Sequence, residues 1–479
     1  MEIKLQKVDA YRWRVPKEGP MRVPGLIFAT EELMRDIHQD QSIQQVAHVA
    51  HLPGILKHSI AMPDIHWGYG FPIGGVAAMD PDEGVLAPGG IGYDINCGAR
   101  LIRTDLEKKD WEPKKKEVMD ALFQNIPSGV GSKGALNLND SELKKVLTEG
   151  VKWAIQNGYA TEADREHMEE SGCMPHADPT QVSVRARERG RPQLGTVGSG
   201  NHFVEVQYVD EIYDEATAHA FGLFKDQITV MIHSGSRGLG YQICDDYLKM
   251  ISQACNRYGI SVPDRQLCCV PLTSPEAHDY FGAMNCAINF AFTNRQIMTH
   301  GVRETFEQIF RRSREDLGMT LVYDVCHNIA KFEEHVVDGK KKRVCVHRKG
   351  ATRAFPPGHP LVPKAYREVG QPVLIPGDMG RYSYVLVGTD RAMEETFGSS
   401  CHGAGRVMSR HQAKKIAGGR NLFKEMEEKG ILVRAPGRGT VAEEISEAYK
   451  DVADVVDVVH GAGIARKVAR LRPLGVLKG

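Results

Sequence analysis

Short runs of β-branched residues with alternating hydrophobic positions recur through the middle of the chain. FVEVQYVD (203–210), ITVMIH (228–233) and LVYDVCHN (321–328) predict strands, and a histidine stands at the end of each of the last two. Between these two runs, residues 274–312 have the length and apolar content of a long helix. Residues 371–390 predict a strand, a turn and a second strand.

Other stretches have the spacing of helices or the composition of turns. Helices are predicted within residues 30–50, 403–418 and 446–460. Residues 60–105 are rich in glycine, proline and β-forming residues, which predicts short strands joined by tight turns. Residues 108–190, roughly, carry charges at helical spacing and predict a peripheral, partly helical excursion. The interleaved elements lack a regular strand–helix–strand alternation, so we predict an α+β fold with a mixed-sheet core.

Composition excludes several classes of protein. The 61 basic and 61 acidic side chains cancel, so a polyanionic partner must be bound by local basic surface. The ten cysteines contain no CxxC pair, which argues against a disulfide framework and a zinc ribbon. The first residues lack the apolar stretch of a signal peptide, and no run approaches the ~20 apolar residues of a membrane span. We therefore expect a cytoplasmic protein with no membrane partner.

Four histidines share one local setting, at a strand end or in a glycine-rich turn: His202, His233, His327 and His402. A fifth segment, DINC, places Asp94 three residues before Cys97. Imidazole, thiolate and carboxylate together suit a borderline divalent metal such as manganese, zinc or iron, and a thiolate can bridge two ions. A lone histidine is more often a structural residue, and a lone buried cysteine is usually a small apolar one. Spacing alone leaves both interpretations open.

Glycines after two of these histidines indicate phosphate binding. His233 begins HSGSRGLG and His402 begins HGAGR, so backbone N–H groups can approach an anion, and Arg237 and Arg406 can clamp phosphate. The segment Pro376–Met379 with Ser383 fits either a nucleotide-contacting loop or a simple hairpin turn. GSGNH matches neither the Walker pattern nor the dinucleotide fingerprint. Three basic clusters fit solvated faces as well as an RNA surface: residues 185–191, 340–343 and 466–472.

Seven segments in order carry a family resemblance. DINCGARL, GSGNHFVEV, HSGSRGLG, DVCHNIA, PGDMGRYSYVLVG, CHGAGR and the terminal Lys478-Gly479 resemble the RtcB family of RNA ligases. The similarity runs from about residue 20 to the end, and MPDIHWGYGFPIGG also looks like the family's early glycine-rich block. The resemblance implies a single catalytic domain over residues 1–479, with a sandwich-like sheet core flanked by helices.

The resemblance also implies a reaction and a set of site residues. The enzyme would join an RNA 3′-phosphate or 2′,3′-cyclic phosphate to a 5′-hydroxyl, in tRNA splicing or RNA repair, using GTP and two Mn²⁺ ions. Asp94, Cys97 and His202 would bind the first metal, and Cys97, His233 and His327 the second. His402 would be the nucleophile that becomes guanylated. The positions that would contact GMP are Asn201, His202, Phe203, Val204, Glu205, His327, Asn328, Pro376, Gly377, Asp378, Met379, Ser383, His402, Gly403, Ala404, Gly405 and Lys478.

The resemblance says less about which residues contact RNA, and the chain departs from the family at one nucleotide-contacting position. Arg237 and Arg406 match arginines that would contact phosphate or RNA. Asp378 stands where serine is common in the family, which puts the nucleotide contact there in doubt. An archease-type activating protein is a further partner that the resemblance suggests.

Two other functions compete with the ligase. A two-metal phosphoesterase acting on RNA 2′,3′-cyclic or 3′-phosphates would use the same metal ligands but would need neither GTP nor His402. An RNA-binding component with a degenerate site is the third interpretation, and the intact set of candidate ligands argues against it.

Overall fold

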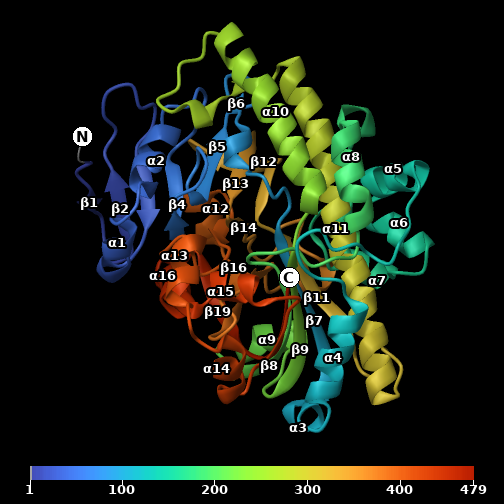
Figure 1. The fold of residues 1–479 in the computed structure, drawn as a ribbon. Helices are drawn as coiled ribbons and strands as arrows, with labels where there is room; N and C mark the ends of the chain where they lie inside the picture. The colour runs from blue at the N-terminus through green and yellow to red at the C-terminus, as the bar shows by residue number, and fades with distance from the viewer. Residues whose placement is uncertain (1–2) are drawn as a thin grey trace.

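A computed structural model describes residues 3–479, in which helices and several sheets form one large α+β domain, as the sequence predicts (Figure 1). The first large sheet has seven strands, all antiparallel except for the β3–β4 pair. Its order is β1 (Gln6–Lys7), β2 (Arg12–Val15), β3 (Gly25–Phe28), β4 (Ser59–His66), β5 (Ile73–Met79), β13 (Lys340–Lys349) and β12 (Asn328–Val337).

The second large sheet has eight strands, seven of them antiparallel along its main path, and it carries most of the candidate site. Its order is β11 (Thr320–Cys326), β7 (Gly98–Glu107), β9 (Gln227–Ser234), β8 (Phe203–Ile212), β19 (Ala465–Lys478), β16 (Ser383–Gly388) and β15 (Pro372–Ile375), and β18 (Leu432–Arg434) pairs with β19 in parallel to complete the eight. Two small ribbons pair β6 (Val85–Leu86) with β10 (Val270–Pro271), and β14 (Ala351–Arg353) with β17 (Ser399–Cys401).

The helices lie to either side of the sheets, and α10 and α11 run next to each other on one of these sides (Figure 1). They are α1 (Glu31–Ile37), α2 (Ser42–Val49), α3 (Lys108–Trp111), α4 (Lys115–Asn125), α5 (Asp140–Glu149), α6 (Val151–Gln156), α7 (Glu162–Glu166), α8 (Val184–Gly190), α9 (Glu215–Phe221), α10 (Arg237–Arg257), α11 (Pro275–Phe310), α12 (Asp390–Thr396), α13 (Arg410–Ile416), α14 (Leu422–Glu428), α15 (Arg438–Glu443) and α16 (Val452–Gly461).

The long helix α11 confirms the prediction for residues 274–312. Its start follows from local chemistry: the Ser274 side chain accepts the N–H of Ala277, and Pro275 occupies the first turn, where its missing N–H costs nothing. Arg311 ends the helix in a left-handed conformation. Helices α4, α5 and α6, from the predicted excursion, pack against α11. Most of α11 is therefore buried, and it forms the central support of this side of the molecule.

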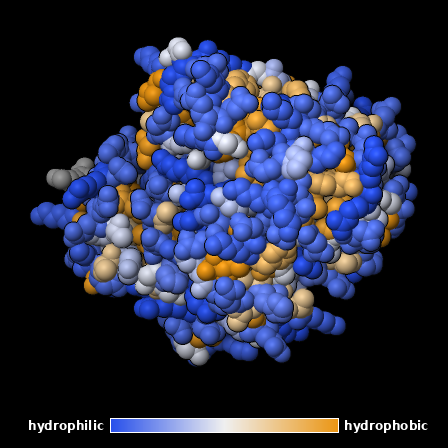
Figure 2. Space-filling view, turned by 90° about the horizontal axis from the view of Figure 1, so that it is seen from below, coloured by the Kyte–Doolittle hydropathy of each residue, from blue (hydrophilic) through white to orange (hydrophobic). Residues whose placement is uncertain are grey.

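Both faces of the eight-stranded sheet are buried, which explains its nearly continuous hydrophobic strands. In β7, Ile102 contributes to a core shared with the seven-stranded sheet and α11, whereas neighbouring Leu101 points into a second core. The same alternation places Val204 and Phe203 of β8 in different cores. Figure 2 shows one mostly hydrophilic face with separate hydrophobic patches. Across residues 3–479, none of the helices combines the length and apolar character that crossing a membrane requires.

Two predicted helices are wrong in extent. Residues 30–50 form two helices, because the Asp40 side chain accepts the N–H of Ser42 and starts a new helix there. Residues 403–409 form a loop, and helix α13 begins only after Ser409, whose side chain caps it. Gly405 has φ +78°, a left-handed conformation incompatible with helix. In the tail, a short 3₁₀ turn at Ser446–Ala448 precedes α16.

Candidate active site

One edge of the eight-stranded sheet brings the predicted site residues together. Gly98 at the start of β7 pairs with Ser234 at the end of β9 and with Cys326 at the end of β11. Phe203 at the start of β8 pairs with His233 and with Lys478 at the end of β19. Because these strand ends share one edge, residues far apart in sequence line one pocket of about 330 Å³.

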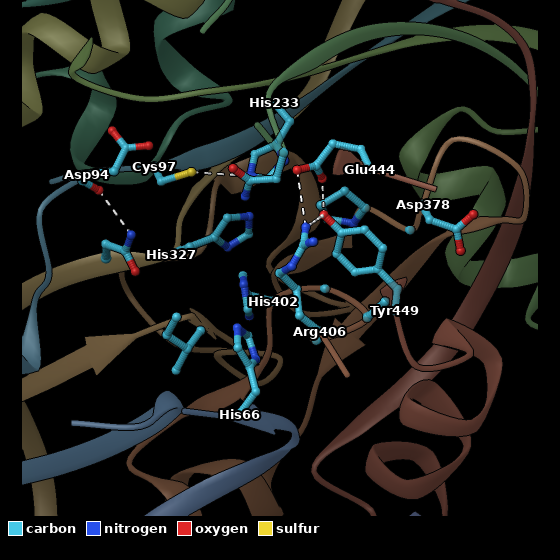
Figure 3. A pocket seen from close by; sticks show the side chains of 18 of the residues that line it. His66, Asp94, Cys97, His233, His327, Asp378, His402, Arg406, Glu444 and Tyr449 are labelled. Carbon is cyan, nitrogen blue, oxygen red and sulfur yellow. Dashed lines mark hydrogen bonds and ion pairs between the residues drawn. The ribbon is translucent and has the colours of Figure 1, made fainter. Parts of the chain in front are cut away.

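The pocket has two sides around a column of histidines (Figure 3). His233, His327, His402 and His66 lie one below another in this view, with Asp94 and Cys97 on one side and Arg406, Glu444, Tyr449 and Asp378 on the other. The first side carries the candidate metal ligands. The second side includes most of the segments predicted to contact a nucleotide.

Asp94, Cys97 and His202 form the densest cluster of potential metal ligands. Their donor atoms all lie within 4.8 Å of one another. His202 Nε2 is 2.8 Å from Asp94 Oδ2 and 3.5 Å from Cys97 Sγ. On its other side, Cys97 Sγ is 3.3 Å from His233 Nε2. The sulfur thus stands between two imidazoles, the position that a bridging thiolate needs.

His327 extends this cluster toward His402. Its ring centroid is 5.5 Å from that of His233 and 5.3 Å from that of His402. Its Nδ1 shares a hydrogen bond of 2.8 Å with Thr352 Oγ1, whereas the buried Nε2 has no hydrogen-bond partner among the described residues. A hydrogen bond at one ring nitrogen typically fixes the other for metal binding.

The chemistry of these donors fits divalent metal ions. Burial lowers the pKa of His233 and of His327 well below the ordinary value, so both rings are neutral and keep a free lone pair. Three imidazoles, a thiol and a carboxylate suit manganese, zinc or iron better than magnesium or calcium. Burial and the neighbouring Asp94 carboxylate raise the pKa of the Cys97 thiol.

A buried arginine on α11 holds the turn that carries Asp94 and Cys97. Arg295 donates to the carbonyl oxygens of Asn96 and Ser234, both at 2.9 Å, and pairs with Asp324 at 2.7 Å. Asn96 has φ +51°, so the turn needs external support. Arg100 also pairs with Asp324, and all three charged side chains are fully buried. The Arg295 guanidinium therefore fixes the turn that carries Asp94 and Cys97 relative to the end of β9.

His402 is oriented by Asp64, a residue at the opposite end of the sequence. Asp64 Oδ2 accepts hydrogen bonds from His402 Nδ1 at 2.6 Å, from the His402 N–H at 2.9 Å and from the Gly403 N–H at 3.2 Å. The His402 interactions keep the pKa of Asp64 below its ordinary value even though burial of the carboxylate opposes this. A carboxylate can only accept, so Nδ1 carries the proton and the lone pair lies on Nε2.

A buried lysine supports the same loop. Lys450 Nζ donates to the carbonyl oxygens of Pro63 at 3.0 Å and of Ile65 at 2.6 Å. Burial lowers the pKa of Lys450 to about 8. The β4 strand that carries Asp64 is thus tied to the segment that leads into α16.

The second side of the pocket, where most of the predicted nucleotide contacts lie, contains several buried polar groups. Gln207 donates to Glu205 Oε1 at 2.6 Å and to Ser383 Oγ at 3.0 Å. Burial raises the pKa of Glu205 to about 8. Lys478 Nζ lies 5.6 Å from the centre of the Phe203 ring. The pocket is lined by Asn201, Phe203, Asn328, Pro376, Gly377, Asp378, Met379, His402, Gly403, Ala404, Gly405 and Lys478.

Four of the predicted GMP-contacting residues do not line the pocket, and one of them, His202, belongs to the cluster of candidate metal ligands. Val204 belongs to the opposite face of β8 because side chains alternate along a strand, and Glu205 and Ser383 are buried without lining the pocket. The Asp378 carboxylate accepts hydrogen bonds from the Ser446 hydroxyl and, at 3.0 Å, from the backbone N–H of Gly380. Burial raises the pKa of Asp378, so its charge is disfavoured where the family often has serine.

The two predicted arginines already have protein partners. Arg237 Nε donates to Thr196 Oγ1 at 3.1 Å, on the metal side. A side chain on Gly198 would lie only 2.3 Å from the Arg237 guanidinium, so glycine there makes room for it. Arg406, which lines the pocket, is paired with Glu444 at 3.1 Å and lies 4.9 Å from the ring centre of Tyr449. A phosphate would have to share or displace these contacts.

Comparisons with known proteins agree along the whole chain. The sequence model described as "tRNA-splicing ligase RtcB" matches residues 45–479. A protein of that name from Thermococcus kodakarensis is 58% identical over 478 residues, covering 100% of this chain and 99% of its own. Namesakes from Archaeoglobus fulgidus and Methanococcus maripaludis are 56% and 54% identical, covering 100% and 98% of this chain and the same shares of their own.

The chain belongs to the RtcB family. Its predicted class, an RNA ligase enzyme, is confirmed with this membership. The RtcB segments quoted from the sequence are the same ones that meet at the sheet edge and around the pocket.

Sequence reasoning missed several residues of this RtcB site. Asp64 is the most important, followed by Thr352, Lys450, Glu444 and Tyr449, which act through contacts with His327, the Asp64 strand or Arg406. The MPDIH segment gave one usable signal, an aspartate inside a hydrophobic strand. A buried acidic residue needs a partner, and only the fold shows that the partner is His402.

Proposed function

We propose that this protein joins RNA ends in a GTP- and Mn²⁺-dependent reaction through a guanylated His402. The substrates would carry a 3′-phosphate or 2′,3′-cyclic phosphate and a 5′-hydroxyl, as in tRNA splicing or RNA repair. The observation that carries the proposal is the pairing of His402 with Asp64, which leaves Nε2 unprotonated beside the cluster of metal donors.

His402 would perform the first step. Its Nε2 attacks the α-phosphorus of GTP, an N–P bond forms, and the bond to the bridging oxygen breaks with release of pyrophosphate. Positive charge develops on the imidazole as it attacks, and Asp64 stabilises that charge through Nδ1. Bound Mn²⁺ would supply charge stabilisation at the phosphate oxygens.

GMP would then be transferred from His402 to the RNA 3′-phosphate and released when the two RNA ends are joined. An oxygen of the RNA 3′-phosphate attacks the phosphorus held by His402, and the N–P bond breaks. The 5′-hydroxyl oxygen next attacks the 3′ phosphorus, its proton is lost, and GMP leaves. A cyclic phosphate would first be opened by water. The phosphate in the new linkage is therefore the one already present on the 3′ end.

The proposed metal ligands are those that the family resemblance implies. Asp94, Cys97 and His202 would hold one ion, and Cys97, His233 and His327 the other, with Cys97 shared between them. The support is the position of the sulfur between His202 and His233 and the orphan Nε2 of His327. The identity of the metal as manganese, the choice of GTP, an archease-type partner and a cytoplasmic location stay predictions.

The test is covalent labelling with α-³²P-GTP and Mn²⁺, followed by denaturing electrophoresis. We expect an acid-labile, alkali-stable label that is absent in His402→Ala and present in His411→Ala, an exposed histidine on α13. Label retained by His402→Ala would refute the nucleophile. No label in metal-loaded protein, together with hydrolysis of 2′,3′-cyclic phosphate ends, would favour the phosphoesterase.

A further inference from the structure

Trp67 is the most exposed aromatic side chain within residues 3–479, at 57%. It lies between His66 and Tyr69, both of which line the pocket. A tryptophan in this position exposes a large apolar surface beside a polar site. No stacking or cation–π contact involves it among the described residues, so its faces are open to a ligand.

The loop that carries Trp67 is fixed from two directions. The backbone N–H of Trp67 donates to Asp40 Oδ2 at 2.8 Å. Gln45, buried on α2, donates to the Gly68 carbonyl at 2.6 Å and accepts the Gly68 N–H at 3.0 Å. Farther along, the Gly70 N–H donates to Gln266 Oε1 at 2.9 Å. The backbone that carries the indole is therefore held in place before any ligand arrives, which reduces the entropy cost of binding.

Other aromatic rings continue from this loop along the pocket wall. Tyr69 meets Tyr93 edge to face, with ring centres 5.7 Å apart, and Tyr93 stacks on Tyr241 at 4.8 Å. Tyr93 directly precedes Asp94 in the chain. Tyr241 is the next most exposed aromatic residue, at 48%, but it already has Tyr93 and the Arg189 guanidinium beside its ring. Among these four aromatic residues, Trp67 is the one whose ring has no aromatic or cationic partner among the described residues.

We propose that Trp67 stacks on an unpaired base next to the reacting end of the RNA substrate. The inference rests on the proposed function, because it takes the pocket as the place where RNA ends react. The zero net charge means that the protein as a whole does not attract RNA, so local contacts must supply affinity. Stacking on an aromatic ring contributes about 1–3 kcal/mol per base and accepts every base, which suits an enzyme that joins ends of varied sequence.

The experiment measures binding of single-stranded RNA carrying 2-aminopurine at its terminal nucleotide, in Mn²⁺ without GTP. One RNA has a 3′-phosphate and the other a 5′-hydroxyl. We expect Trp67→Ala to weaken binding of one of them roughly tenfold and to reduce quenching of its 2-aminopurine, whereas Trp67→Phe stays within about threefold. The RNA that shows the loss is the strand that lies on Trp67. Equal binding of both RNAs by Trp67→Ala and wild type would overturn the proposal.

Two controls separate stacking from a general defect. Tyr258→Ala removes an aromatic residue of similar exposure, 42%, at the far end of α10, and should bind like wild type. An RNA with an abasic terminal nucleotide should bind wild type and Trp67→Ala equally. A loss that persists with abasic RNA would show that Trp67 supports the loop rather than a base.

Labelling with α-³²P-GTP on the same samples keeps the two hypotheses apart, because guanylation needs no RNA. Unlabelled wild type would refute the proposed function, while the binding data would still decide whether Trp67 stacks on RNA. Loss of labelling in Trp67→Ala would instead refute the stacking role by showing damage to the pocket itself.

Discussion

Replacing Asp64 with asparagine tests the role assigned to His402. The amide oxygen can still accept from the His402 and Gly403 N–H groups and from Nδ1, so the tautomer should be kept. What is lost is the negative charge that faces the imidazole as it becomes cationic. Hydrogen bonds to a charged group contribute about 1.5–3 kcal/mol, against about 0.5–1.5 kcal/mol for neutral pairs. The difference of about 1–1.5 kcal/mol predicts a decrease of about 5- to 13-fold in the rate of guanylation.

The same substitution should also affect stability. Asp64 Oδ1 has no hydrogen-bond partner among the described residues, so the new NH₂ group would be buried there without an acceptor. That costs about 1–3 kcal/mol and should lower Tm. Because the pKa of Asp64 is lowered below 3.8, its charge stabilises the fold above that pH and stops doing so as the pH falls through the lowered pKa. Asp64→Asn should lack this loss in acid.

The assay is single-turnover labelling with α-³²P-GTP at saturating Mn²⁺, well below the Tm of each variant. Asp82→Asn, at an exposed position on the loop after β5, provides the matched control and should label at the wild-type rate. If folded Asp64→Asn labels within twofold of wild type, Asp64 does not stabilise the attacking imidazole and the reasoning is wrong.

The remaining predictions concern the metal side of the pocket. Cys97→Ala should lose Mn²⁺ measured by metal analysis after desalting, and with it guanylation, because the sulfur stands between His202 and His233; full ligation at ordinary Mn²⁺ would exclude a bridging thiolate. Arg295→Leu should lower the free energy of unfolding by about 3–5 kcal/mol in urea denaturation, because Asp324 keeps only Arg100 as a charged partner and two carbonyl oxygens lose their donor. An unfolding free energy within 1 kcal/mol of wild type would contradict this account of the turn.

The buried charged residues around the site each hold a site residue, or the segment that carries it, in position. Asp324 with its two arginines supports the metal-binding turn, Asp64 supports His402, and Lys450 supports the strand of Asp64. Each group acts on residues far away in the sequence. Removing one member of such a group leaves the others buried with fewer partners, so substitutions there should affect the site even though these residues do not contact the substrate.

Local sequence alone was enough to predict much of the sheet and the candidate ligands. Strands β9 and β11 are β-branched runs: β9 carries His233 next to its last residue, and β11 ends directly before His327. Helix α11 starts at a serine followed by proline. Strand and helix periods depend on nearby residues, so they can be read from one segment at a time. The residue types of the metal side were also recognisable, because thiol, imidazole and carboxylate near glycine are uncommon together.

Tertiary structure alone decided which of these residues meet and in what state. The partnership of His402 with Asp64 joins residues 338 positions apart, and Arg295 reaches the Asn96 carbonyl across 199. Residues 403–409 had a helical pattern, but Gly405 is left-handed and packs against the Asp64 backbone, so a loop forms there. Such contacts depend on how two distant strands are placed, and burial then sets which side chains are charged. A sequence pattern shows which groups can do chemistry, whereas their orientation and protonation arise only when the chain packs.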